Sequence, residues 1–144
     1  MRFRFVSQLE SNDCGPACLA MVARTYGNYT ELKEIKELCS VTRMGVSVND
    51  ILEGGRKLGL ESNGLKLTPQ DLTQIPLPAI LFWKQDHFVV LHKIKQKKGK
   101  LLYHIADPGY GSTVIQEDLL KKEWIGNNIK GVCLVFQTTE KFKA

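Results

Sequence analysis

The chain has 144 residues, 43% of them hydrophobic, and a formal net charge of +5. This length and apolar content are typical of a single globular domain, over residues 1–144, that closes its own core. No apolar run approaches the ~20 residues of a membrane-spanning helix, and the first residues lack the apolar region of a secretion signal. The four cysteines show neither disulfide-framework density nor zinc-ribbon spacing, which favours a reducing compartment.

Helical patterns occupy the first part of the chain. The first helix is expected from about residue 14 to residue 26 and is ended by Gly27. The second helix places Leu32 and Ile35 on one face, and the third stops at Gly59. The predicted N-caps are Asn12 or Asp13 for the first helix, Thr30 for the second, and Ser47 with Asp50 as a capping box for the third.

From Pro78 onward the pattern changes to strands. The expected strands are 79–83, 87–95, 100–106, 113–115 and 132–137, preceded by a short strand at 65–67. A helical turn is expected at 68–71, and a helix at 117–124 between the last two strands. This order predicts an α+β fold, in which an N-terminal helical half packs against a C-terminal antiparallel sheet half.

Positive charge concentrates around one expected hairpin turn. The lysines there are Lys93, Lys95, Lys97, Lys98 and Lys100. A solvated hairpin tip explains them, and attraction of an acidic peptide or an anionic lipid surface is the alternative. These lysines are not interleaved with aromatic residues and no nucleic-acid motif is present, so no nucleic acid partner is predicted.

The segment from Gln8 to Cys18 carries the strongest chemical signal. It places Cys14 at the expected start of the first helix, where unpaired N–H groups and a partial positive charge favour thiolate over thiol. Thiolate is the form that attacks carbonyl carbon, and it needs a base that is itself held by an orienting group. His87 and Asp107, in two later segments, offer that base and that group.

The expected hairpin gives an argument for pairing His87 with Asp107. Partners across an antiparallel hairpin have position numbers with a constant sum, and the sum of 194 for this pair centres on Lys97, within about one residue of the turn. His87 and Asp107 should therefore lie nearly opposite each other on one face, where the carboxylate can orient the imidazole. The same register pairs His104 with Val90 and His92 with Leu102, on the other face.

Three blocks of sequence, in this order, carry a resemblance to a known family. The first is 8–18 with its Asp13-Cys14-Gly15 core, the second is 79–83 leading into 87–91, and the third is 105–108. Together they resemble the bacteriocin-processing, double-glycine leader peptidase family. Its members are papain-like cysteine peptidase domains at the N-terminus of bacterial peptide-exporting ABC transporters. The similarity covers essentially the whole chain.

The resemblance implies a papain-like fold with the active-site cleft between the two halves. It implies that Cys14 is the nucleophile, that His87 is its base and that Asp107 holds His87. Gln8 would donate its side-chain N–H to the oxyanion. No cofactor and no metal are expected for this domain, since ATP and magnesium would belong to the nucleotide-binding domain of a full-length exporter.

The resemblance also implies partners and a location. The substrate would be a bacteriocin, lantibiotic or related precursor peptide whose amphipathic leader helix ends in Gly-Gly or Gly-Ala. The domain would be the N-terminal part of a longer ABC exporter, with transmembrane and ATPase domains as partners, at the cytoplasmic side of the bacterial membrane. The leader helix would dock on an apolar patch, for which Tyr26, Met44 and Phe88 are candidates.

Two other functions stay open on the sequence alone. The run Cys14-Gly15-Pro16-Ala17-Cys18 resembles the Cys-Gly-Pro-Cys of thioredoxin-like oxidoreductases with one extra residue, so dithiol chemistry of its two cysteines is one alternative. A leader-binding module without catalysis is the other. A metal site that joins the first cysteine to His87 has weak support, because Cys39 and Cys133 lack ligand spacing and are expected in the core.

Overall fold

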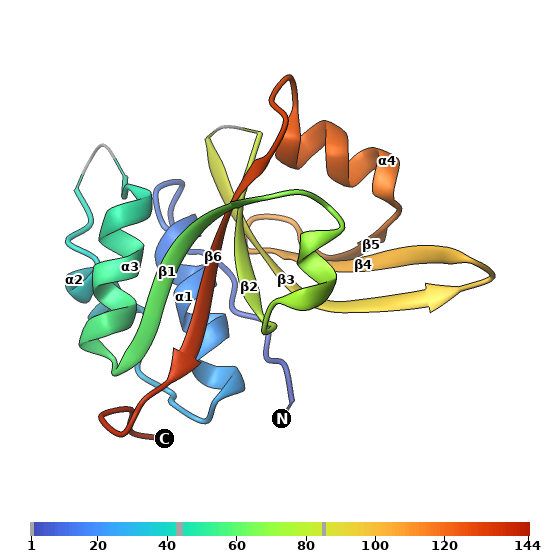
Figure 1. Ribbon diagram of the computed structural model, residues 1–144. Helices are drawn as coiled ribbons and strands as arrows, with labels where there is room; N and C mark the ends of the chain where they lie inside the picture. Colours follow the sequence, from blue (N-terminus) through green and yellow to red (C-terminus); the bar gives the residue numbers. More distant parts are fainter. Residues whose placement is uncertain (1, 43–44, 85) are drawn as a thin grey trace.

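A computed structural model describes residues 2–42, 45–84 and 86–144. Within these ranges the chain forms four α-helices, two short helical turns and a six-stranded antiparallel sheet (Figure 1). The helical elements are α1 (Cys14–Thr25), α2 (Leu32–Leu38), α3 (Val48–Lys57), the 3₁₀ turn η1 (Asp71–Gln74), α4 (Glu117–Leu120) and the π-helical turn η2 (Lys121–Ile125). The strands are β1 (Leu60–Leu67), β2 (Ala79–Trp83), β3 (His87–Lys97), β4 (Lys100–Asp107), β5 (Gly111–Ile115) and β6 (Gly131–Thr138). The predicted α+β class is confirmed.

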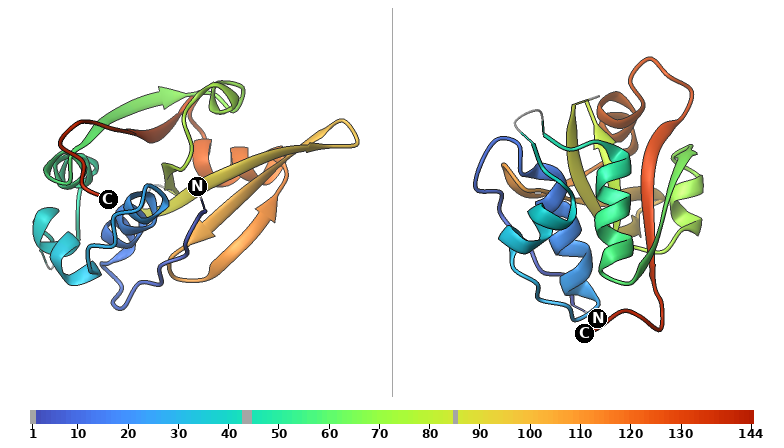
Figure 2. Two further views of the ribbon diagram at one scale, coloured as in Figure 1. Left: turned by 90° about the horizontal axis from the view of Figure 1, so that it is seen from below. Right: turned by 90° about the vertical axis from the view of Figure 1, so that its left-hand side faces the viewer.

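The sheet has the order β1-β6-β2-β3-β4-β5 and separates two core layers. Helices α1, α2 and α3 cover one face, and α4 with η2 covers the other (Figures 1 and 2). Ile80 and Val90 pack into the first layer, whereas Leu81 and Val89 pack into the second, because successive strand residues point to opposite faces. No helix in the described ranges is long and apolar enough to cross a bilayer.

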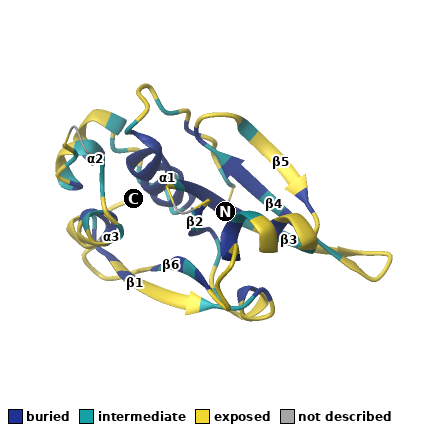
Figure 3. Ribbon diagram, turned by 90° about the horizontal axis from the view of Figure 1, so that it is seen from above, coloured by how far each residue is buried: buried dark blue, intermediate teal, exposed yellow. Residues whose placement is uncertain are grey.

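Helix α1 is the central element of the first layer and is buried along nearly its whole length (Figure 3). It starts at Cys14, as predicted, and ends before Gly27, whose φ of 96° is a left-handed conformation that glycine adopts at little cost. The predicted side-chain caps are wrong. Asn12 donates instead to a carbonyl of the loop after α2, and Asp13 pairs with Lys36.

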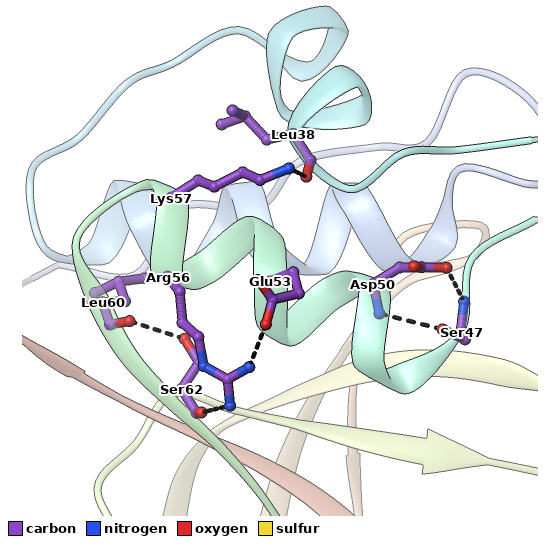
Figure 4. A network of polar contacts seen from close by, with 8 residues as sticks. All are labelled: Leu38, Ser47, Asp50, Glu53, Arg56, Lys57, Leu60 and Ser62. Carbon is purple, nitrogen blue, oxygen red and sulfur yellow. Dashed lines mark hydrogen bonds and ion pairs between the residues drawn. The ribbon is translucent and has the colours of Figure 1, made fainter.

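Helices α2 and α3 begin in different ways. Thr30 does not cap α2, because Glu31 occupies the N-cap position and Thr30 hydrogen-bonds to Asn28. At α3 the predicted capping box is confirmed (Figure 4). Ser47 Oγ accepts from the Asp50 backbone N–H at 3.1 Å, and Asp50 Oδ2 accepts from the Ser47 backbone N–H at 3.0 Å.

Arg56, near the end of α3, ties this helix to the following strand. Its guanidinium donates to Glu53 Oε1 at 2.6 Å and to the backbone carbonyl of Ser62 at 2.8 Å (Figure 4). Strand β1 is longer than the predicted 65–67 because it pairs along its whole length with β6. The added residues run from Leu60 to Gly64, and all of them except Leu60 are polar or glycine, so their sequence shows no strand pattern.

The hairpin between β3 and β4 turns over two residues, Lys98 and Gly99. Both have positive φ, 51° and 77°, as the commonest two-residue hairpin turn requires. Partner positions sum to 197 next to this turn, and a bulge between Leu91 and Lys93 lowers the sum to 196 farther along. The strands therefore extend closer to the turn than the sequence predicts.

The predicted register of this hairpin is wrong in consequence. Val90 lies opposite Ala106, not opposite His104. Continuing this pairing by one residue puts Asp107 beside position 89, two residues from His87 and on the same face. The two side chains are thus diagonal neighbours, a separation that an imidazole and a carboxylate can bridge.

The far end of the same hairpin protrudes from the body of the molecule (Figures 1 and 2). All of the lysines that the sequence places there, from Lys93 to Lys100, are exposed. This agrees with a solvated tip. Binding of an acidic peptide or lipid surface by these lysines stays a prediction.

Candidate active site

Cys14 is the first residue of α1 and is 9% exposed. At the N-terminus of this 12-residue helix, the sulfur lies where backbone N–H groups are unpaired and the helix dipole favours negative charge. Gly15 follows it, and a side chain there would overlap the side chains of Val46 and Ile51. Glycine therefore lets the start of α1 pack closely against the start of α3.

His87 and Asp107 form the polar pair at the site. His87 is the first residue of β3 and Asp107 the last of β4, and His87 Nε2 lies 2.8 Å from Asp107 Oδ1. The same oxygen accepts a hydrogen bond from the Gly109 backbone N–H at 2.9 Å. The carboxylate is thus held by its own turn, and it fixes the orientation of the imidazole.

The other ring nitrogen of His87, Nδ1, is left for Cys14. The hydrogen bond to Cys14 is the main cause that raises the pKa of His87 to about 9; burial opposes this rise, and Asp107 adds to it. The imidazole therefore carries a proton at neutral pH. A protonated imidazole between a sulfur and a carboxylate is the arrangement that activates cysteine nucleophiles.

Gln8 is brought beside this group by the N-terminal segment. Its backbone N–H donates to the carbonyl of Pro108 at 3.0 Å, and its Nε2 donates to the carbonyl of Glu10 at 3.0 Å. A side chain on Gly109 would lie 3.3 Å from Gln8 Oε1 and 3.5 Å from Asp107 Oδ1, so the turn after β4 contacts both residues. The structure brings together all the site residues predicted from the sequence, namely Gln8, Cys14, His87 and Asp107.

The remaining cysteines are free thiols in the core. Cys18 is fully buried, and burial raises its pKa well above the ordinary range. Burial likewise raises the pKa values of Cys39 and Cys133 to about 12. A resolving thiol has to be reachable and partly ionised, so the state of Cys18 argues against dithiol chemistry.

The candidates for the leader-docking patch do not share one surface. Phe88 is only 4% exposed and packs against Phe82, with ring centroids 5.1 Å apart. Tyr26 lies at the opposite end of α1 from Cys14, in edge contact with Phe142, with ring centroids 6.3 Å apart. Met44 lies outside the described residues. Phe88 is therefore a core residue next to His87 and not part of an exposed docking patch.

Sequence reasoning missed two residues that hold the site. Gly109 was not singled out, although the Asp-Pro-Gly sequence of residues 107–109 is a strong turn signal. Lys36 was missed as well, and its Nζ lies 2.9 Å from Oδ1 of Asp13, the residue before Cys14. No local pattern in α2 indicates this partner, because the contact depends on how α2 packs on the loop before α1.

A thiol at the start of a buried helix, beside an imidazole and a carboxylate carried by an antiparallel sheet, defines the papain-like class of cysteine peptidases. The known proteins agree with this class. The model of the Peptidase C39 family matches residues 2–139, and the chain belongs to that family. Family membership in turn supports a cysteine peptidase.

Solved structures with this fold include a double glycine motif protease from an AMS/PCAT transporter, in complex with the leader peptide. The match has a TM-score of 0.84 and 31% identity, and it covers 96% of this chain and 93% of that one. The peptidase domain of Streptococcus ComA, a bifunctional ABC transporter, matches with a TM-score of 0.82 over 96% of this chain and 100% of that one. At 24% identity, this second likeness shows the fold alone.

Curated relatives are much longer than this chain. The lactococcin-G-processing and transport ATP-binding protein of Lactococcus lactis subsp. lactis is 31% identical over 85% of this chain and 18% of its own length. The pediocin PA-1 transport/processing ATP-binding protein of Pediococcus acidilactici is 26% identical over 96% of this chain and 19% of its own length. The chain thus spans less than a fifth of either relative.

Proposed function

We propose that this domain is a cysteine endopeptidase that removes a double-glycine-type leader from a bacteriocin, lantibiotic or related precursor peptide. The observation that carries the proposal is His87, bonded through Nε2 to Asp107 and in hydrogen-bond contact with Cys14. Acyl transfer to sulfur uses all three groups, whereas dithiol chemistry or leader binding alone would not need the His87–Asp107 pair.

The proposed reaction starts from a Cys14 thiolate and a His87 imidazolium, with Asp107 as a carboxylate. The Cys14 thiolate attacks the carbonyl carbon of the last leader residue and forms a tetrahedral intermediate. The His87 imidazolium then gives its proton to the leaving amine, which releases the mature peptide and leaves a thioester on Cys14. Neutral His87 next takes a proton from water, whose oxygen attacks the thioester and frees the leader. Asp107 keeps one imidazole orientation throughout.

The oxyanion needs donors that are held in place before the reaction. We assign this role to the backbone N–H of Cys14 and the side-chain amide of Gln8. One hydrogen of Gln8 Nε2 is bound to the Glu10 carbonyl, which fixes the amide and leaves the second hydrogen for substrate. The bond from the Gln8 backbone to Pro108 keeps the residue beside Asp107.

We propose that the leader helix binds in a groove on the face of the sheet that α1, α2 and α3 cover, beside the segment that leads into β6. The half-buried Phe82 and Val132 and the exposed Ile129 line this groove, and Lys66 and Lys130 contribute positive charge. Phe82 pairs with the residue next to His87, so the groove lies at the same end of the sheet as the site. Such a surface suits the apolar face of an amphipathic helix with acidic flanks.

The wider setting rests on the long relatives. Their names describe processing and transport ATP-binding proteins, and a structural neighbour holds a leader peptide. We propose that this chain is the N-terminal peptidase domain of such an exporter, at the cytoplasmic side of the bacterial membrane. The transmembrane and ATPase domains would be its partners, and ATP and magnesium would act there.

A cleavage assay tests the proposal. The purified domain is mixed with precursor peptides whose leaders end in Gly-Gly, and the masses of the products are measured by mass spectrometry. Cleavage directly after the second glycine is expected, with loss of activity in Cys14→Ala and in His87→Ala, and retention in the control Cys18→Ser. Binding of the leader without cleavage by the wild type would instead favour a silent binding module.

A further inference from the structure

A buried carboxylate lies immediately before the nucleophile. Asp13 is 0% exposed and is the residue that precedes Cys14. An anion in that position opposes the formation of a second anion on the sulfur, and burial weakens the screening by water. A site that uses a Cys14 thiolate therefore requires something to balance Asp13.

Lys36 supplies the opposite charge. Its Nζ lies 2.9 Å from Asp13 Oδ1 and 3.8 Å from Glu10 Oε2. The hydrogen bond to Asp13 is the main cause that raises the pKa of Lys36. Lys36 is 26% exposed, so its stem lies against the protein while the ammonium reaches the carboxylate. This contact links α2, an element outside the proposed triad, to the loop that immediately precedes the proposed nucleophile.

The same carboxylate organises the loop that leads to Gln8. Asp13 Oδ2 accepts from the Glu10 backbone N–H at 3.0 Å, and the Asp13 backbone N–H donates to the Glu10 carbonyl at 3.1 Å. That carbonyl also accepts from Gln8 Nε2 at 3.0 Å. The side chain that we assign to the oxyanion is thus one hydrogen bond away from a peptide unit that Asp13 holds.

The surroundings of Cys14 leave Lys36 as the balancing charge. His87 of β3 contacts Cys14, and Cys18 of α1 and Asp107 of β4 belong to the same group of titratable side chains. Asp13 and Glu10 come from the loop before Cys14, and Lys36 of α2 pairs with both of them. Asp107 is already paired with His87. Cys18 is a buried neutral thiol. Within the described residues, the ion pair of Asp13 is the one with Lys36.

We infer that Lys36 is a positioning residue of this site: as the counter-ion of the buried Asp13, it permits a thiolate at Cys14 and holds the Gln8-bearing loop closed. The inference rests on the proposed function, because it takes Cys14 as the nucleophile. Lys36 touches neither the substrate nor the reacting atoms. It acts through Asp13, whose buried charge would otherwise stand unpaired at the residue before Cys14.

The test measures alkylation of Cys14 by iodoacetamide across pH 5 to 9, with peptide mapping by mass spectrometry to count only this cysteine. Lys36→Met should move the pH of half-maximal alkylation upward by about one unit, so that alkylation at pH values below that midpoint slows by up to about tenfold. Lys36→Arg keeps the charge and should match the wild type. Lys33→Met, which removes a lysine from the same helix without touching Asp13, is the matched control and should also match.

A double variant separates charge balance from simple damage. Asp13→Asn keeps an oxygen that can accept from the Glu10 N–H but removes the negative charge. Lys36→Met combined with Asp13→Asn should therefore bring alkylation at pH 6 back to within about threefold of the wild type, a recovery that a purely structural role of Lys36 would not give. Circular dichroism melting of each variant checks that the fold is kept.

Two results overturn the inference. One is an alkylation profile of Lys36→Met that superimposes on that of the wild type; the other is a loss that the added Asp13→Asn change does not restore. Should Lys36→Met not fold, the double variant alone decides, since failure of its Cys14 to react at pH 6 counts against charge balance. Failure of the proposed function looks different: wild-type Cys14 would then react no faster than an ordinary free thiol, and the precursor would stay whole.

Discussion

Replacing Cys14 with alanine removes the group that contributes most to the high pKa of His87. That pKa lies about 2.5 pH units above the ordinary 6.5, since it is raised to about 9. At about 1.36 kcal/mol per unit, the surroundings favour the imidazolium by about 3 kcal/mol. In Cys14→Ala the raising effect of Asp107 remains against the lowering effect of burial. We expect the titration midpoint of His87 to fall by at least about one unit.

Two-dimensional NMR of the imidazole nitrogens in the wild type and in Cys14→Ala measures this change. His92 and His104 are internal controls, because burial lowers both of their pKa values, that of His92 to about 4, and neither midpoint should move. A His87 midpoint that stays near 9 without the sulfur would refute the reasoning. It would mean that Asp107 alone sustains the charge and that Cys14 and His87 are not coupled.

The same coupling has a consequence for stability. A pKa raised in the folded state contributes stability that is fully present below the unfolded value of about 6.5 and is lost as pH rises through about 9. The contribution of His87 should therefore fade between these two values. Urea unfolding at pH 6 and pH 9.5 should show a larger loss in the wild type than in Cys14→Ala. Equal losses would contradict the coupling.

Three further changes test other parts of the site. Asp107→Asn should lower kcat but leave cleavage measurable. The loss should be smaller than the ~10²–10⁴-fold that removal of a general base costs, because Asp107 acts through His87. An unchanged kcat would show that Asp107 has no role in the reaction. Gln8→Ala should lower kcat by on the order of 10²–10³ with little change in KM, and the reverse pattern in steady-state kinetics would indicate a binding role. Gly15→Ala should cost about 1–3 kcal/mol in urea unfolding, because its methyl group would overlap Val46 and Ile51, and a neutral effect would show that α1 and α3 are not closely packed there.

Features that depend on neighbouring residues could be predicted from the sequence, whereas features that depend on tertiary contacts could not. The capping box of Ser47 and Asp50 involves four consecutive residues, so the pattern alone specifies it. Asp13 looked like an equally good cap, yet its carboxylate is used in a tertiary ion pair with Lys36. No local pattern ranks those two uses of a carboxylate, because the second depends on the packing of α2.

The pairing of His87 with Asp107 also shows that sequence patterns predict a contact better than the exact strand register. The sequence places both residues at the ends of two hairpin strands, and the structure joins them at 2.8 Å. The expected register was nevertheless wrong, because a bulge between Leu91 and Lys93 shifts the partners and the turn is tighter than predicted. His87 and Asp107 are nevertheless in contact, because side chains that are diagonal neighbours on one face of the sheet can reach each other.

The segment from Gln8 to Asp13 explains how elements so distant in sequence form one site. At one end, the Gln8 backbone is bound to Pro108 in the turn that follows β4. At the other end, Asp13 is bound to Lys36 of α2, and α1 begins at the next residue. Its two ends are anchored to different elements, the turn after β4 and helix α2, so the segment resists the separation of these elements. Because the chain entropy of so short a connection is already lost when its ends are fixed, Cys14 and the His87 imidazole are held together before the proposed substrate binds.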